Sequence, residues 1–129
     1  METLKYKVDI EGYPCARPRL SKYGVHNSTK YTKHKSDLTF LIKALHIPKK
    51  NYEYLRINFY FPYPASEPKK NRLDLAPMNR KYDLDNLLKS FMDALTQSGV
   101  IEDDRYICGF YAEKLFTTEK KGWIEFEFE

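Results

Sequence analysis

Three short stretches of the chain alternate apolar and polar residues. In residues 4–10, 54–61 and 124–128, a Leu, Ile, Val, Tyr or Phe occupies every second position. Since successive side chains of a strand point to opposite faces of a sheet, this period of two predicts half-buried β-strands. The glutamates at 125, 127 and 129 are then the solvent face of the last strand. Residues 106–116 also favour a strand, which makes about four strands in total.

Two other segments place apolar residues at the three- and four-residue spacing of an amphipathic helix. The stronger pattern consists of Leu84, Leu87, Leu88, Phe91, Met92 and Leu95. Asp85 or Asn86 is its expected cap, and Gly99 its expected stop, because glycine enters the left-handed C-cap conformation without strain. The second pattern consists of Leu38, Leu41, Ile42 and Leu45 and ends before Pro48.

Two polar, basic segments lack these periods. Residues 22–35 interleave tyrosines and isolated histidines with lysines, and we expect a flexible loop that clamps nucleic acid or becomes ordered on binding it. Residues 62–82 are rich in proline and basic residues, and loops of this length are usually functional or disordered. Their position before Asp83 favours a flap that contacts nucleic acid. Its basic residues are Lys69, Lys70, Arg72, Arg80 and Lys81.

Together these elements predict an α+β fold. We expect a small mixed sheet of about four strands with two helices packed on one of its faces. The 129 residues are enough for one domain that buries a core without disulfides, and we assign residues 1–129 to it.

Charge and cysteine content narrow the classes of function. The chain has 22 Lys and Arg against 18 Asp and Glu, a net charge of +4. If the clustered acids bind a cation, the remaining surface is more basic than this sum and suits a polyanion. Cys15 and Cys108 lie far apart, so we expect neither a zinc site nor a disulfide, and a reduced, cytoplasmic protein. Without a long apolar run, we expect no membrane partner.

Acidic residues gather on either side of the stronger helix. Asp83 and Asp85 are two residues apart, so an extended backbone would direct both side chains to the same side. Lys89 follows Asp85 by one helical turn and projects beside it, away from the leucine face. The chain then returns to a second acidic pair, Asp103 and Asp104, before a predicted strand. A helix that leaves and a strand that returns bring the two pairs together in this interpretation.

Carboxylate oxygens are the ligands that Mg²⁺ and Mn²⁺ prefer, and three aspartates from two segments suit such an ion. A metal held in this way polarises a phosphoryl oxygen and generates hydroxide, while a nearby lysine stabilises the transition state. The alternative is purely structural. An Asp-x-Asp pair at a helix start is often a cap, and an Asp–Lys pair four residues apart is often a surface contact contributing about 0.3 to 0.5 kcal/mol.

The same residues resemble a family signature. The order Asp83-Leu84-Asp85-Asn86-Leu87, Lys89, Asp93-Ala94-Leu95, Gly99 and Asp103-Asp104 is similar to that of the RusA family of Holliday junction resolvases, which are crossover junction endodeoxyribonucleases. The match is dense over about 25 residues, and the small size of the chain agrees with it. The resemblance implies a small fold of mixed α and β structure.

Carried over residue by residue, the resemblance implies site residues and a cofactor. Asp83, Asp85 and Asp104 become metal ligands, and Lys89 becomes the catalytic lysine. Asp103 is the less favoured ligand of its pair. Mg²⁺ is the implied cofactor, and we expect Mn²⁺ to substitute for it.

An arginine-proline-arginine segment near the N-terminus is also typical of many members of this family. It gives Arg17 and Arg19 an expected contact with substrate phosphate. A solvated turn is the alternative for these two residues, since arginine clusters are usually no more than that.

The resulting expectation is a Mg²⁺-dependent endodeoxyribonuclease that resolves four-way junctions by paired symmetric nicks. Because a junction has approximate two-fold symmetry and the chain carries one acidic site, we expect a homodimer. A non-catalytic protein that binds branched DNA is the alternative. A metal-dependent transferase for nucleotide sugars is weaker, because nothing in the chain indicates a doubly wound nucleotide-binding sheet.

Overall fold

The computed structural model describes residues 4–15, 19–21, 24–26 and 29–129. Its helices are α1 (Thr29–Ala44) and α2 (Leu84–Gln97), with two single-turn 3-10 helices, η1 (Lys69–Asn71) and η2 (Asp104–Tyr106). The main sheet contains β1 (Leu4–Val8), β4 (Tyr54–Pro62), β5 (Gly109–Thr117) and β6 (Trp123–Phe128), and a separate hairpin pairs β2 (Arg19–Ser21) with β3 (Gly24–His26). In these ranges, no helix has the length and apolar character needed to span a membrane.

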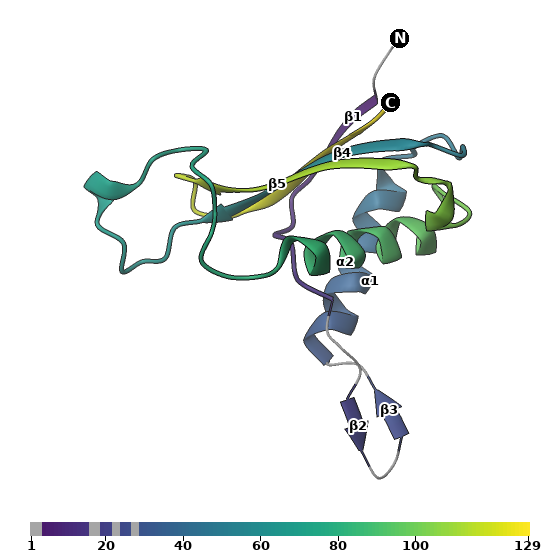
Figure 1. The fold of residues 1–129 in the computed structure, drawn as a ribbon, viewed down its shortest axis with the longest axis horizontal. Coiled ribbons are helices and arrows are strands. Elements are labelled where there is room, and N and C mark those ends of the chain that lie inside the picture. The colour runs from purple at the N-terminus through teal and green to yellow at the C-terminus, as the bar shows by residue number, and fades with distance from the viewer. Residues whose placement is uncertain (1–3, 16–18, 22–23, 27–28) are drawn as a thin grey trace.

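The main sheet has the strand order β1-β6-β4-β5. β4 and β5 run parallel, while β6 is antiparallel to both β1 and β4. A parallel pair needs a long crossover connection, and here that connection contains α2. Both α1 and α2 lie on one face of the sheet (Figure 1). The predicted α+β fold and its four strands are therefore confirmed.

The core fills the space between the sheet and the two helices. Inward positions on the strands are apolar, as at Ile57, Phe59 and Phe126, each at most 3% exposed. Phe91 of α2 is fully buried, and its ring meets that of Phe126 edge-on with centroids 4.9 Å apart. The apolar stripe predicted for this helix is thus the surface that fixes α2 against the sheet.

The loop predicted for residues 22–35 is wrong over the described part of this range, residues 24–26 and 29–35, while residues 22, 23, 27 and 28 fall outside the described residues. Residues 24–26 form β3, and α1 begins at Thr29, well before the apolar pattern around Leu38. The reason lies in the first half of α1. Its inward face carries Tyr31, which is 3% exposed, and the half-buried His34, so this face is aromatic and not aliphatic. A search for aliphatic periodicity therefore finds only the second half of the helix.

The cap predicted for α2 is also wrong. Asp83 occupies the cap position, with φ −74° and ψ 134°, and the helix begins at Leu84. Asp85 therefore lies in the first turn, and the extended backbone expected for both aspartates is present only at Asp83. The predicted stop is confirmed, because Gly99 follows the helix with φ 85°.

Residues 62–82 form the predicted long connection, and contacts within it fix its path. The Arg72 guanidinium donates to the carbonyl of Glu67 at 2.7 and 3.0 Å. Residues 75–78 run along the edge of β5 and exchange backbone hydrogen bonds with residues 114–116. The connection thus extends the fold beyond the sheet, where η1 lies at its tip (Figure 1).

Candidate active site

The backbone that leads into α2 is held in an unusual conformation. Tyr82 has φ 63°, in the left-handed region that a bulky residue rarely enters. The Lys114 ammonium, reaching from β5, donates to the Tyr82 carbonyl at 2.6 Å, and the Tyr82 ring packs against Phe61. These contacts fix the direction of the chain at Asp83, whose side chain makes no capping hydrogen bond to α2. The Asp83 carboxylate is therefore not used by its own helix.

The first turn of α2 places Asp85 beside the N-terminal segment. One Asp85 carboxylate oxygen accepts the Asn86 amide hydrogen at 3.0 Å. The Asn86 carbonyl in turn accepts the Cys15 amide hydrogen at 2.9 Å. Residues 11–15 thus pass next to the helix start, where the partial positive charge of the helix dipole favours carboxylates.

Lys89 lies one turn further along α2 and is hydrogen bonded to Asp93. Its ammonium donates to Asp93 Oδ1 at 3.1 Å. The other carboxylate oxygen, Oδ2, accepts the Tyr31 hydroxyl from α1 at 2.9 Å. The hydrogen bond and charge of Asp93 raise the pKa of Lys89, and the charge of Asp104 raises it further, so Lys89 is a cation at neutral pH.

The second acidic pair begins η2, against the second half of α2. Asp103 caps η2 by accepting the Arg105 amide hydrogen at 3.0 Å. This hydrogen bond lowers the pKa of Asp103, as do a hydrogen bond with Asp104 and the charge of Arg105. Asp103 and Asp104 line a hollow together with Asp93. The surface formed by α2 and η2, here named the α2–η2 surface, thus carries the residues that sequence reasoning selected.

The acids of the α2–η2 surface fall into two groups. Asp83 and Asp85 lie at the helix start, whereas Asp103 and Asp104 share their hollow with Asp93. Asp93 follows Asp85 by eight positions, a rise of about 12 Å along a helix. Lys89 stands between the groups. Within the described part of the chain, no three Asp, Glu, His or Cys side chains are grouped closely enough to hold one metal ion.

The donor chemistry of the α2–η2 surface fits Mg²⁺ or Mn²⁺, since both take carboxylate oxygens as ligands. Among the described residues, however, no three such side chains are grouped for one metal ion, and Asp104 lines a hollow with Asp93. The roles of Asp83, Asp85 and Asp104 as ligands, and of Asp103 as a further one, therefore stay predictions.

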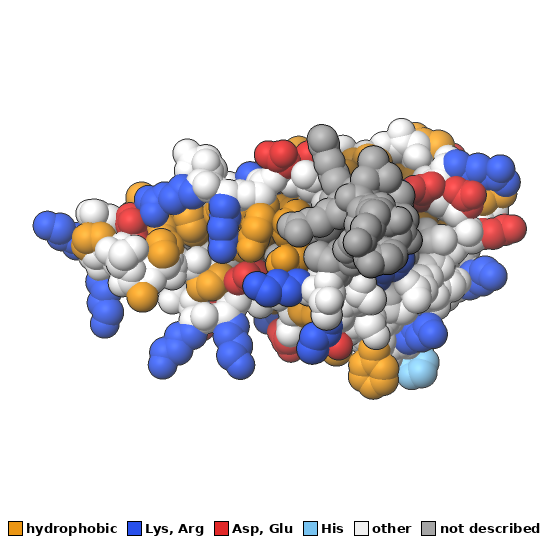
Figure 2. Space-filling model, turned by 90° about the horizontal axis from the view of Figure 1, so that it is seen from below, with side chains coloured by type: hydrophobic (Ala, Val, Ile, Leu, Met, Phe, Trp, Pro, Cys, Tyr) orange, Lys and Arg blue, Asp and Glu red, His pale blue; other side chains and the backbone are white. Residues whose placement is uncertain are grey.

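Some of the residues predicted to contact nucleic acid have side chains bonded to other parts of the protein, and others are exposed. Arg72 is bonded to carbonyls of its own loop, and Arg80 forms a bidentate ion pair with Glu67 at 2.9 and 3.1 Å. Lys69 and Lys70 of η1 are exposed. Figure 2 shows basic side chains gathered at the end of the molecule where η1 lies.

The remaining predicted contacts lie near the N-terminus or just before Asp83. Lys81 is exposed, and its ammonium lies 4.8 Å from the centroid of the Tyr82 ring. Arg19 belongs to β2, and Arg17 falls outside the described residues. Of the predicted phosphate contacts whose side chains are described, Lys69, Lys70, Arg80 and Lys81 are exposed, and Arg80 is paired with Glu67.

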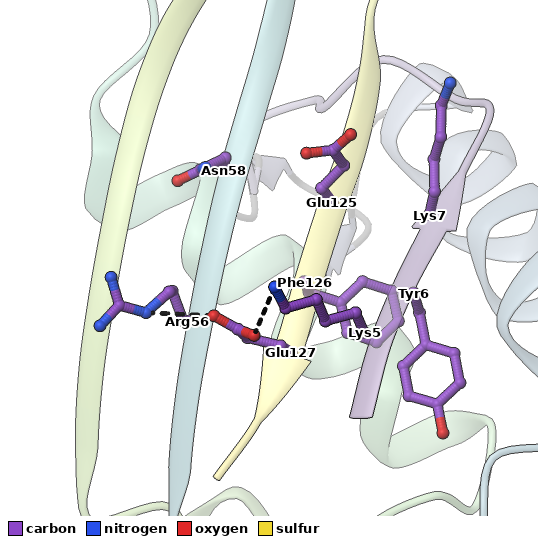
Figure 3. A pocket seen from close by; sticks show the side chains of 8 residues that line it. All are labelled: Lys5, Tyr6, Lys7, Arg56, Asn58, Glu125, Phe126 and Glu127. Atoms are coloured by element: carbon purple, nitrogen blue, oxygen red, sulfur yellow. Dashed lines mark ion pairs between the residues drawn. The ribbon is translucent and has the colours of Figure 1, made fainter. Parts of the chain in front are cut away.

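A shallow groove crosses the opposite face of the sheet (Figure 3). Its charges are arranged in pairs. Glu127 forms ion pairs with Arg56 at 3.2 Å and with Lys5 at 4.0 Å, while Glu125 accepts hydrogen bonds from two aromatic side chains. The groove is separated from α2 by the sheet itself. These contacts agree with the prediction that the glutamates of β6 form a solvent face.

Comparison with known families agrees with the residue pattern. A family model described as "Endodeoxyribonuclease RusA" matches residues 9–127, nearly the whole chain. The chain belongs to the RusA endodeoxyribonuclease family. A search of curated proteins finds no match. Membership of the RusA family makes the α2–η2 surface the candidate active site of a nuclease.

The structure adds residues to this RusA site that sequence reasoning did not select. Tyr31 and Lys114 come from segments far from α2 in the sequence, and only the fold brings them to it. Asp93 did carry a signal, since it follows Lys89 by one helical turn.

Proposed function

We propose that this protein is a structure-selective endonuclease that cuts four-way DNA junctions at the α2–η2 surface. The observation that carries the proposal is the placement of Lys89, a cation between two groups of aspartates, in a chain of the RusA family. Phosphodiester cleavage needs positive charge where the transition state accumulates negative charge. Lys89 supplies that charge, and its side chain is 57% exposed and thus accessible to a phosphate.

A divalent metal ion is part of the proposal. The surface carries four exposed or half-buried aspartates, at 83, 85, 103 and 104, and the ammonium of Lys89 is already hydrogen bonded to Asp93. Such a surface repels a phosphodiester unless cations neutralise it. We propose Mg²⁺, with Mn²⁺ as a substitute, and Asp83, Asp85 and Asp104 as its ligands. When bound, the metal supplies Lewis acidity and lowers the pKa of water.

The basic residues position the DNA backbone. Lys69, Lys70 and Lys81 are exposed and contact phosphates in this proposal, as do Arg17 and Arg19. Arg72 and Arg80 act differently, since their guanidinium groups hold the 62–82 connection in shape. Phosphate contacts of this kind give affinity that falls steeply with salt, while the branch geometry gives selectivity.

Resolution of a junction needs two nicks in opposing strands. One chain carries one α2–η2 surface, so we propose a homodimer with two-fold symmetry that presents one site to each strand. The two sites are then related by the same axis that relates the junction arms.

The test uses a labelled four-way junction and a linear duplex of the same sequence. With Mg²⁺, the wild-type protein should nick the junction and leave the duplex intact, and EDTA should stop cleavage but preserve binding. Asp83→Asn, Asp85→Asn and Asp104→Asn should each bind the junction without cutting it. A variant that cuts at the wild-type rate removes its residue from the site.

A second function is favoured by one observation. Because no three carboxylates are grouped for a metal in the described residues, a non-catalytic protein that binds branched DNA also agrees with the geometry. The same assay separates the two, since junction binding without cleavage at any Mg²⁺ or Mn²⁺ concentration would favour the binding protein.

A further inference from the structure

The Lys89–Asp93 pair differs from an ordinary surface ion pair because a third residue holds it. Asp93 uses both carboxylate oxygens, Oδ1 for the Lys89 ammonium and Oδ2 for the Tyr31 hydroxyl. Tyr31 comes from α1, which packs against α2 (Figure 1), and it is 3% exposed. The direction of the Asp93 carboxylate is therefore set by a contact between two helices.

The chain contains a second pair of the same type that allows comparison. Lys33 and Asp37 on α1 have the same four-residue spacing, and the Lys33 ammonium lies 2.7 Å from Asp37 Oδ2. The Asp37 side chain is 49% exposed, against 25% for Asp93. An exposed pair of this kind contributes little, because long side chains exchange partners freely in water. The added Tyr31 contact and the lower exposure make the Asp93 carboxylate a fixed acceptor.

The Tyr31 hydroxyl acts as a donor to Asp93 at every pH of interest. Burial raises the pKa of Tyr31, and hydrogen bonds with Cys15 and Asp93 raise it further. A hydroxyl that keeps its proton holds the Asp93 carboxylate as an acceptor.

Lys89 also has a competing partner, because the charge of Asp104 acts on it from η2. Without a fixed carboxylate on its own helix, the ammonium would turn toward Asp104 and neutralise a proposed metal ligand. The contact with Asp93 holds the ammonium against the surface of α2.

From this geometry we propose that Asp93 is a positioning residue for Lys89 and that Tyr31 positions Asp93, so that a relay across two helices places the lysine at the scissile phosphate. The proposal rests on the proposed function, since it assumes that Lys89 acts in cleavage. It assigns neither Asp93 nor Tyr31 a contact with substrate.

The experiment compares Asp93→Asn and Tyr31→Phe with Asp37→Asn, the matched control on α1. The first readout is independent of catalysis: NMR titration of the Lys89 ammonium in the DNA-free protein. The pKa of Lys89 should fall in Asp93→Asn, fall less in Tyr31→Phe and stay unchanged in Asp37→Asn. An unchanged pKa of Lys89 in Asp93→Asn overturns the relay.

The second readout is junction cleavage as a function of pH. Loss of a residue that orients a metal ligand typically costs about ten- to a hundredfold in activity, and we take this as the scale for a residue that orients a catalytic lysine. We expect a loss of this size in kcat for Asp93→Asn, a smaller one for Tyr31→Phe, and an unchanged KM for both. Because Asp93 raises the pKa of Lys89, its removal should also move the alkaline limb of the profile to lower pH.

The two readouts distinguish failure of the relay from failure of the proposed function. If the wild-type protein cuts junctions and Asp93→Asn cuts equally well with the same pH profile, the relay is wrong and the nuclease stands. If the wild-type protein does not cut, the nuclease is wrong, and so is the role of the relay in placing Lys89 for cleavage. Since Tyr31→Phe keeps the buried ring, it tests the hydroxyl even where Asp93→Asn affects folding.

Discussion

Phe91→Ala should destabilise the protein by removing the packing of α2 on the sheet. The side chain is fully buried, and its ring meets that of Phe126 edge-on at 4.9 Å. Deletion of a buried phenylalanine side chain loses the transfer free energy and leaves a cavity, at a cost of about 3 to 5 kcal/mol. For a chain of this length, that corresponds to a fall of about 10 to 20 °C in Tm.

Urea denaturation followed by circular dichroism measures this loss. Phe40→Ala is the matched control, because it removes the same side chain from α1, where Phe40 is 71% exposed. It should change the free energy of unfolding by no more than about 0.5 kcal/mol. If Phe91→Ala costs less than about 1 kcal/mol, or if both variants cost the same, α2 does not pack on the sheet as described.

Three further predictions concern backbone, pH and salt. Gly122→Ala should destabilise the fold more than Gly99→Ala, as compared by thermal melts. A Cβ at Gly122 overlaps the backbone carbonyl of Tyr60, whereas at Gly99 the Cβ has open space and the cost is only the backbone strain of φ 85°. Desolvation lowers the pKa of His34 from its usual 6.5, although a hydrogen bond to the backbone carbonyl of Glu11 opposes this shift. Because the folded protein binds this proton less tightly than the unfolded chain does, protonation of His34 favours unfolding. Stability should therefore fall as the pH drops from 6.5 through the lowered pKa, and His34→Gln should flatten that dependence in urea titrations. Lys69→Ala and Lys70→Ala should each reduce by about one the slope of log affinity for a junction against log salt, and an unchanged slope would remove that lysine from the interface.

The sequence predicted the sheet well because each strand has one buried face. The alternation of apolar and polar residues at 54–61 and 124–128 reflects that burial directly. The structure has strands β4 and β6 at these positions. The first half of α1 was missed because Tyr31 and His34 form its inward face, and an aromatic and a histidine do not produce an aliphatic stripe. Strand order and the β2–β3 hairpin depend on contacts between distant segments, which no local pattern contains.

The candidate site was predictable to the extent that it lies on one helix. Asp85, Lys89 and Asp93 follow helical spacing, so their order along α2 could be inferred from the sequence. The approach of Tyr31 and Lys114 could not, because it depends on how α1 and β5 pack around α2. The approach of Asp104 to Asp83 and Asp85 stays a prediction, and what the structure adds is that Asp104 lines a hollow with Asp93.

The central claim, that a pair of α2–η2 surfaces resolves four-way junctions, is tested most directly with a supercoiled plasmid that extrudes a cruciform. Paired nicks across the junction convert this plasmid to the linear form, whereas a single nick only relaxes it. We predict Mg²⁺-dependent linear product with the wild-type protein, and none with Lys89→Ala at protein concentrations that saturate the cruciform. A plasmid that stays supercoiled with the wild-type protein, or that Lys89→Ala linearises at the same rate, would contradict the account.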